Sequence, residues 1–100
     1  MPQQKTSERI KERTTYKFPR FYKVIMFNDD VTTMDFVVMI LRNVFNKDEA
    51  EAEKLMLDVH NNGQATVGIY TYDMAITKVA QTNMMAREKE FPLRLIFQPA

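Results

Sequence analysis

The chain first shows the short apolar and aromatic run of a strand and then apolar residues at helical spacing. The segment FYKVIMFN, residues 21–28, is rich in β-branched and aromatic side chains and short enough to be a strand. Thr32 or Thr33 can cap the helix that follows, with Asp35 reaching back as in a capping box. The apolar face of this helix, with positions three and four residues apart, comprises Val37, Ile40, Leu41, Val44 and Phe45.

A second helix is predicted close behind the first, so that the two form a hairpin. Asn46 followed three residues later by Glu49 predicts its start, and the sequence NNG predicts its end at Gly63. The apolar residues expected on its buried face are Ala52, Leu55, Met56 and Val59.

The rest of the chain predicts a strand, a helix and a last strand. In the segment ATVGIYT, residues 65–71, the apolar residues Ala65, Val67 and Ile69 alternate with the residues at positions 66, 68 and 70. This is the period of a half-buried strand. Thr71 can cap a third helix with Met74, Ala75, Val79 and Ala80 on one face. Pro92 ends it, and LRLIFQ supplies the final strand. The predicted fold class is α+β, in the order β-α-α-β-α-β, with three helices packed on one face of a three-stranded antiparallel sheet.

The chain of 100 residues, 45% of them hydrophobic, fits one small domain. Residues 1–19 lack an apolar period and end in KFPR, which predicts a flexible N-terminal arm before a core domain at residues 20–100. Up to Lys23 there are seven basic and two acidic residues, a net charge of +5; the remainder has seven basic and eleven acidic residues, a net charge of −4. Such an arm can bind nucleic acid, but its basic residues are interleaved with Glu and Thr, and most solvated tails of this kind bind nothing. An acidic protein surface is an equally good partner.

Composition excludes several functional classes. The chain has no Cys and one His, so neither a disulfide framework nor a multi-histidine metal site is expected, and no cofactor is predicted. No apolar run approaches the roughly 20 residues that span a bilayer, and the polar start lacks a signal peptide. We therefore expect a cytoplasmic protein without a membrane partner.

The stretch FNDDVTT places Asn28, Asp29 and Asp30 between the first strand and the first helix. A turn with a helix cap explains one acceptor, and this is the simpler interpretation. The additional carboxylates favour a cation, and an ammonium group with three donors is a good match. His60 ends the second helix and, as a neutral imidazole, can accept a hydrogen bond, although a packed or capping histidine is the alternative.

Three other interpretations are weighed against this one. Adjacent carboxylates diverge in extended backbone, and Ser7 lies in the arm, so an Asp-pair enzyme or a Ser-His-Asp triad is disfavoured and no enzyme is predicted. A divalent-ion site at the Asp pair is a second alternative. A ribosome- or nucleic-acid-associated module using the basic arm is the third.

With these residues assembled, the sequence resembles the ClpS family, small adaptors that deliver N-degron substrates to a ClpAP-type AAA+ protease. The likeness runs from about Tyr22 to Leu93. It is carried by YKVIMFNDDVTTMDFVV, LMLDVHNNGQATVGIYT, TKVA and FPLRL, in the family's order and spacing. Several separated motifs agree, which makes the resemblance specific. It implies a bacterial cytoplasmic adaptor, with the plastid stroma as the alternative location.

The resemblance implies a site that binds the first residue of a substrate protein, favouring Phe, Tyr, Trp or Leu. Asn28, Asp29, Asp30 and His60 match the residues that bind the free α-amino group. Alternation along an extended segment places Asp30 on the side of Asn28, so Asp30 is the expected contact and Asp29 the alternative. The matches to the hydrophobic pocket are Thr32, Met34, Val37, Met56, Val59 and Leu93.

The resemblance also implies a docking surface on the third helix. Asp73 and Lys78 match positions that look toward the N-terminal domain of a ClpA-type chaperone, and the arm takes part in delivery. Two positions depart from the family pattern. Thr33 replaces a common proline at the helix start, and Ile76 stands where an acidic docking residue often lies.

Overall fold

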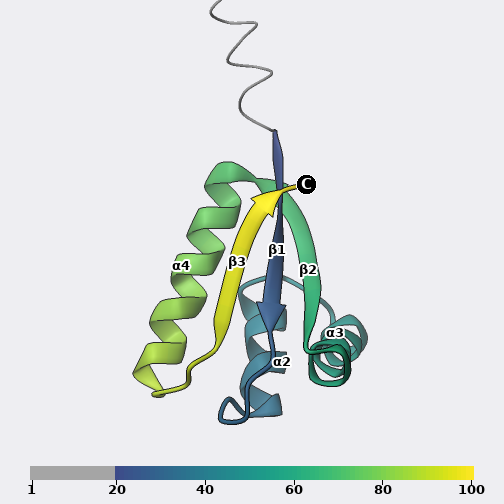
Figure 1. Cartoon of the computed structure of the whole chain (residues 1–100), viewed down its shortest axis with the longest axis vertical. Coiled ribbons are helices and arrows are strands. Elements are labelled where there is room, and N and C mark those ends of the chain that lie inside the picture. The colour runs from purple at the N-terminus through teal and green to yellow at the C-terminus, as the bar shows by residue number, and fades with distance from the viewer. Residues whose placement is uncertain (1–19) are drawn as a thin grey trace, which may run out of the picture.

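The computed structural model describes residues 20–100, which follow the predicted β-α-α-β-α-β order. The predicted arm, residues 1–19, lies outside the described residues. No helix of the described part is long and apolar enough to cross a membrane. In chain order the elements are β1 (Phe21–Phe27), α2 (Met34–Asn43), α3 (Glu49–Asn62), β2 (Gln64–Thr71), α4 (Tyr72–Glu88) and β3 (Arg94–Pro99) (Figure 1).

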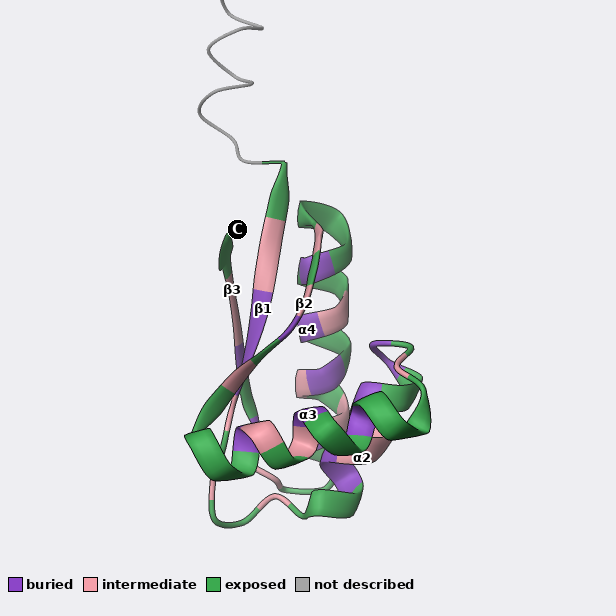
Figure 2. Cartoon of the chain, turned by 90° about the vertical axis from the view of Figure 1, so that its right-hand side faces the viewer, coloured by how far each residue is buried: buried purple, intermediate pink, exposed green. Residues whose placement is uncertain are grey.

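The three strands form one antiparallel sheet in the order β2-β1-β3, with β1 in the centre. Figure 2 views the molecule from the side and shows the three helices on the same side of the sheet. Helix α4 contacts all three strands, and α3 contacts β2 and α2. The predicted fold class, a sheet covered by helices on one face, is confirmed.

The core lies between the sheet and the helices, and the predicted apolar faces form most of it. Val24 and Met26 of β1 are fully buried, as are Ile40 and Leu41 of α2. Residues two apart on a strand and three or four apart on a helix share a face, which is why both periods point into one core. The other buried core residues are Phe36, Val37, Val44, Phe45, Ala52, Leu55, Val59, Val67, Ala75, Val79, Ala86, Leu93 and Leu95.

The structure identifies the N-cap residues of the two hairpin helices. For α2 the sequence left two candidates open, and for α3 it predicted a start that lies too early in the chain. The Thr33 hydroxyl accepts the Phe36 backbone N–H at 3.2 Å and caps α2. Asp35 is then the second helical residue, so the predicted capping box, which needs the third, is wrong. The cap of α3 is Asp48, not Asn46. Asn46 has φ 57° and turns the chain between the helices, a left-handed conformation that asparagine tolerates.

In strand β2, one residue predicted to share the buried face is exposed instead. The pairing register shifts between Val24 and Ile25, which leaves Val67 as an extra residue of β2. Such a bulge changes which side chains of the strand face the core. Val67 is 2% exposed, as predicted, but Ile69 is 60% exposed and Tyr70 packs against the core instead.

Helix α4 buries a narrower stripe than predicted. Ala75 and Val79 are buried, whereas Met74 and Ala80 are exposed because only one side of α4 contacts the sheet. Thr71 occupies the N-cap position, but its side chain makes no capping hydrogen bond.

Candidate functional site

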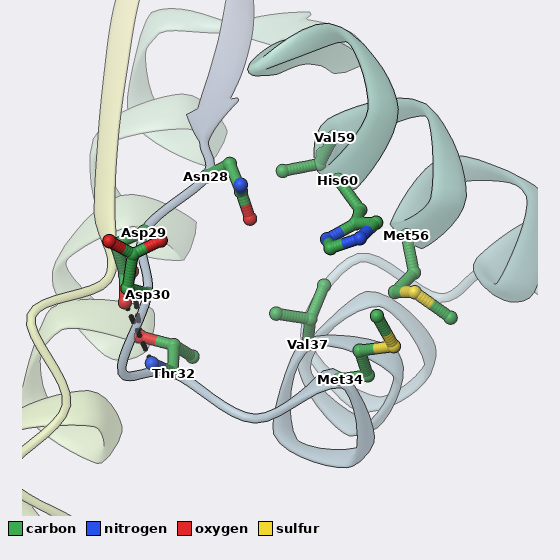
Figure 3. A pocket seen from close by; sticks show the side chains of 9 residues that line it. All are labelled: Asn28, Asp29, Asp30, Thr32, Met34, Val37, Met56, Val59 and His60. Atoms are coloured by element: carbon green, nitrogen blue, oxygen red, sulfur yellow. Dashed lines mark hydrogen bonds between the residues drawn. The ribbon is translucent and has the colours of Figure 1, made fainter.

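A hollow of about 250 Å³ opens between the β1–α2 loop and the two hairpin helices. Figure 3 shows the loop on one side and the helices on the other; Asn28, Val59 and His60 project toward the space between them, and Asp29 and Asp30 lie beside the loop. Nine of the ten residues predicted for the amino-group and hydrophobic sites line it. They are Asn28, Asp29, Asp30, Thr32, Met34, Val37, Met56, Val59 and His60.

The antiparallel pairing of β1 with β2 brings the distant parts of the hollow together. Phe27, the last residue of β1, pairs with Gln64, the first residue of β2. The next residue, Asn28, donates its backbone N–H to the Gly63 carbonyl oxygen at 2.9 Å. Gly63 ends α3 with φ 86°, in the left-handed region that glycine adopts readily. His60 stands three residues earlier, so the same contact places Asn28 and His60 on one hollow.

The Asp29 carboxylate is engaged with the loop that contains it. One oxygen, Oδ1, accepts the backbone N–H groups of Val31 at 2.8 Å and Thr32 at 2.7 Å. The other, Oδ2, accepts the Thr32 hydroxyl at 2.8 Å. Desolvation raises the pKa of Asp29, but these hydrogen bonds outweigh it and hold the pKa below its usual value. Asp29 therefore fixes the shape of the loop.

The Asp30 carboxylate is placed differently from its neighbour. Asp30 is exposed and lines the hollow. Within residues 20–100 it has no hydrogen-bond or ion-pair partner, in contrast to Asp29. Its oxygens are free to accept hydrogen bonds from a ligand, and its charge adds to the negative potential on this side of the hollow.

Apolar side chains form the helical side of the hollow. Val37 and Val59 are buried, Met56 is partly buried, and Met34 at the start of α2 is 45% exposed. This combination of a polar loop and an apolar wall can hold a molecule that carries a cation beside an apolar group. Leu93 lies outside the lining; it is 6% exposed and belongs to the hydrophobic core.

The two predicted docking residues line a second hollow of about 270 Å³ on α4. Lys78 is partly buried there, and its Nζ donates to the Val44 carbonyl oxygen at 2.7 Å. The ammonium also lies 5.8 Å from the Phe45 ring centre and 5.5 Å from that of Tyr70. Burial raises the pKa of Tyr70. The lining residues are Asp73, Met74, Thr77, Lys78 and Gln81.

Two contributors to these sites were missed from the sequence. The NNG pattern predicts the end of a helix, but nothing in it indicates that the Gly63 carbonyl meets Asn28. No sequence signal connects Lys78 with Val44, 34 positions away. Among residues 20–100, no group of three or more His, Asp or Glu residues is arranged to hold a metal ion.

Comparison with known proteins shows which family this chain resembles. The family model described as ATP-dependent Clp protease adaptor protein ClpS matches residues 17–96. The chain is 50% identical over 96 residues to the Clp protease adapter ClpS of Acetivibrio thermocellus, covering 96% of this chain and 97% of the relative. It is 58% identical over 76 residues to that of Syntrophus aciditrophicus, covering 76% and 71%.

A solved structure agrees with these relatives. Agrobacterium tumefaciens ClpS2, determined bound to L-phenylalaninamide, superposes with a TM-score of 0.78 at 34% sequence identity. The match covers 82% of this chain and 99% of that protein. The shared fold therefore extends across nearly the whole of the neighbouring structure.

Proposed function

The chain belongs to the ClpS family of Clp protease adaptors, and from that premise we propose that its hollow binds the free N-terminus of N-degron substrates. One observation carries the proposal: the acceptors of Asn28, Asp30 and His60 line the same hollow as an apolar wall. The first residue of a protein presents an ammonium group beside a side chain, and so does L-phenylalaninamide, the ligand of ClpS2. Binding and delivery are the proposed roles, with no catalytic step and no cofactor.

The polar loop recognises the ammonium group in this proposal. Asp30 supplies the negative charge, while the Asn28 side-chain oxygen and a neutral His60 nitrogen accept further hydrogen bonds. Asp29 contributes indirectly, because its carboxylate oxygens are already occupied by Val31 and Thr32. Three acceptors around one ammonium match its three N–H donors.

The apolar wall recognises the first side chain. This side chain would be surrounded by Met34, Val37, Met56 and Val59. Thr32 lines the same hollow from the loop. A Phe, Tyr, Trp or Leu side chain buries apolar surface there without needing polar partners in the wall. Leu93 would support this wall only through the core.

The proposed interactions give moderate affinity. Hydrogen bonds to a charged group contribute roughly 1.5–3 kcal/mol each. Burial of one large apolar side chain contributes about another 1.5–3 kcal/mol. Because association itself opposes binding, two or three such bonds correspond to micromolar rather than picomolar dissociation constants. Moderate affinity suits an adaptor that must release its substrate to a protease.

The second hollow is the proposed docking surface for the N-terminal domain of a ClpA-type chaperone. Asp73 is exposed and supplies a charge at its edge. The Lys78 ammonium is already bonded to the Val44 carbonyl, so we assign Lys78 a supporting role that holds α4 against the end of α2. Any direct contact between Lys78 and the chaperone would add to this internal bond.

Titration of one peptide in two forms tests the proposal. A short peptide beginning with Phe is measured with a free and with an acetylated N-terminus. Acetylation removes the positive charge and two donors, so we expect affinity to fall by at least about a hundredfold, the equivalent of roughly two charged hydrogen bonds. Equal affinity for both forms would refute the proposed N-terminus recognition.

A further inference from the structure

Two methionine side chains form one part of the apolar wall of the hollow. Met34 comes from α2 and Met56 from α3, and Figure 3 shows both side chains on the helical side of the hollow. Met34 is 45% exposed, whereas Met56 is partly buried against the core. A dissolved oxidant therefore reaches the sulfur of Met34 more readily than that of Met56.

The other methionines of the described part are either shielded or distant from this hollow. Met26 is fully buried, and Met39 and Met85 are partly buried against the core. Met74 and Met84, on α4, are 48% and 64% exposed, but neither lines the hollow. Within residues 20–100, Met34 is thus the methionine that combines exposure above one third with a place in the wall.

We propose that Met34 is an oxidation site whose sulfoxide weakens peptide binding, an inference that rests on the proposed function of the hollow. The oxidant is a peroxide. The thioether sulfur attacks one peroxide oxygen, the S–O bond forms as the O–O bond breaks, and the second oxygen leaves as water in the case of hydrogen peroxide. The sulfur loses two electrons and the peroxide gains them. Methionine sulfoxide reductases reverse the change with thiol reductants.

The sulfoxide weakens binding because the wall around Met34 cannot satisfy it. Oxidation converts a flexible apolar side chain into a polar one. The side chains of Val37, Met56 and Val59 carry no hydrogen-bond donor, so a bound apolar side chain would exclude water from the new oxygen without replacing its hydrogen bonds. We expect peptide affinity to fall about tenfold, equivalent to roughly 1.4 kcal/mol.

The experiment follows oxidation and binding in the same samples of full-length protein. Dilute hydrogen peroxide is applied for increasing times, peptide mass spectrometry gives the oxidised fraction at each methionine, and affinity for a Phe-initiated peptide is titrated. Met34→Leu removes the sulfur at nearly constant volume. Met84→Leu is the matched control, since Met84 is exposed and outside the hollow. Each variant is compared with its own untreated form, which cancels any effect of the substitution itself.

The expected result is a loss of affinity that follows the oxidised fraction at Met34, returns after sulfoxide reductase treatment, persists in Met84→Leu and is absent in Met34→Leu. Full affinity in wild-type protein with Met34 oxidised would overturn the inference, as would an equal loss in Met34→Leu. In both cases the untreated protein still binds, so the proposed function stands. Failure of untreated protein to bind the peptide would overturn both.

Discussion

The hollow proposed to bind peptide and the hollow on α4 are built in different ways. The first gathers residues from the β1–α2 loop, α2 and α3, and it depends on the contact between Asn28 and Gly63. The second is lined by five residues of the single helix α4, and its lysine is bonded to the end of α2. Similar volumes therefore need not imply similar roles. The first hollow presents free acceptors beside an apolar wall, whereas the second is an exposed surface whose lysine ammonium is already bonded to a backbone carbonyl.

The charges in the two hollows sharpen this contrast. In the first, one carboxylate is held by backbone N–H groups and the next one, Asp30, is free within the described residues. In the second, Asp73 is exposed, while the ammonium of Lys78 lies over the rings of Phe45 and Tyr70. We therefore expect substitutions in the first hollow to change ligand binding, and the loss of Lys78 to change stability.

The largest expected effect separates Asp30 of the first hollow from Asp73 of the second. Asp30→Asn removes the charge that we assign to the ammonium contact, so affinity for a Phe-initiated peptide should fall about tenfold to a hundredfold. Asp73→Asn, the matched change in the second hollow, should leave this affinity unchanged. Calorimetric titration of both variants measures the difference. Similar affinities in the two variants would remove Asp30 from the site.

A smaller effect is expected on folding stability from Lys78→Met, which keeps a long unbranched apolar side chain but removes the ammonium donor. The Val44 carbonyl loses its bond to Lys78, so the free energy of unfolding should decrease by about 1–2 kcal/mol. Chemical denaturation measures this change, with Lys54→Met on the exposed side of α3 as the control. Peptide affinity should not change in either variant. Unaltered stability in Lys78→Met would argue that the bond is dispensable and that Lys78 serves the partner directly.

The third effect concerns His60. In the proposed site a ring nitrogen of His60 accepts a hydrogen bond from the ammonium group of the peptide. His60→Ala removes this acceptor, so affinity for a Phe-initiated peptide should fall about fivefold to tenfold. Fluorescence titration of the variant measures the change, and an affinity equal to that of the wild type would remove His60 from the site.

The smallest effect is expected from Asp29. Its folded-state pKa is lowered, so its contribution to stability is complete above the unfolded pKa near 4 and is lost as the pH falls through the lower folded value. Because Asp29 is only partly buried, this contribution should stay below about 1 kcal/mol. The stability difference between wild type and Asp29→Asn should therefore be larger at neutral pH than in acid. Urea unfolding at several pH values measures it; a constant difference would contradict the role of the charge.

Much of the fold could be predicted because it is encoded in local patterns. The five residues predicted for the apolar face of the first helix are buried, since helical spacing and burial are directly linked, although Phe36 is buried as well and the last two of the five, Val44 and Phe45, follow the end of α2. The predicted start of α3 is wrong because Asn46 and Asp48 are both good N-cap residues. Only the structure shows that Asn46 adopts the left-handed conformation between the helices and that Asp48 is the cap. The prediction that Ile69 shares the buried face of β2 is wrong. The bulge responsible arises from the pairing with β1, and the alternation of residues in β2 alone does not reveal it.

The sequence by itself determined the order of the elements, the residues of the polar loop and the resemblance of several separated motifs to one family. The tertiary structure decided which of those residues meet. The pairing of Phe27 with Gln64 brings the loop to the end of α3, and the hydrogen bonds of Asp29 leave Asp30 as the free carboxylate. The physical reason is range: periodicity, caps and composition act over a few residues, whereas sheet register and the bond from Lys78 to Val44 join positions far apart in the chain.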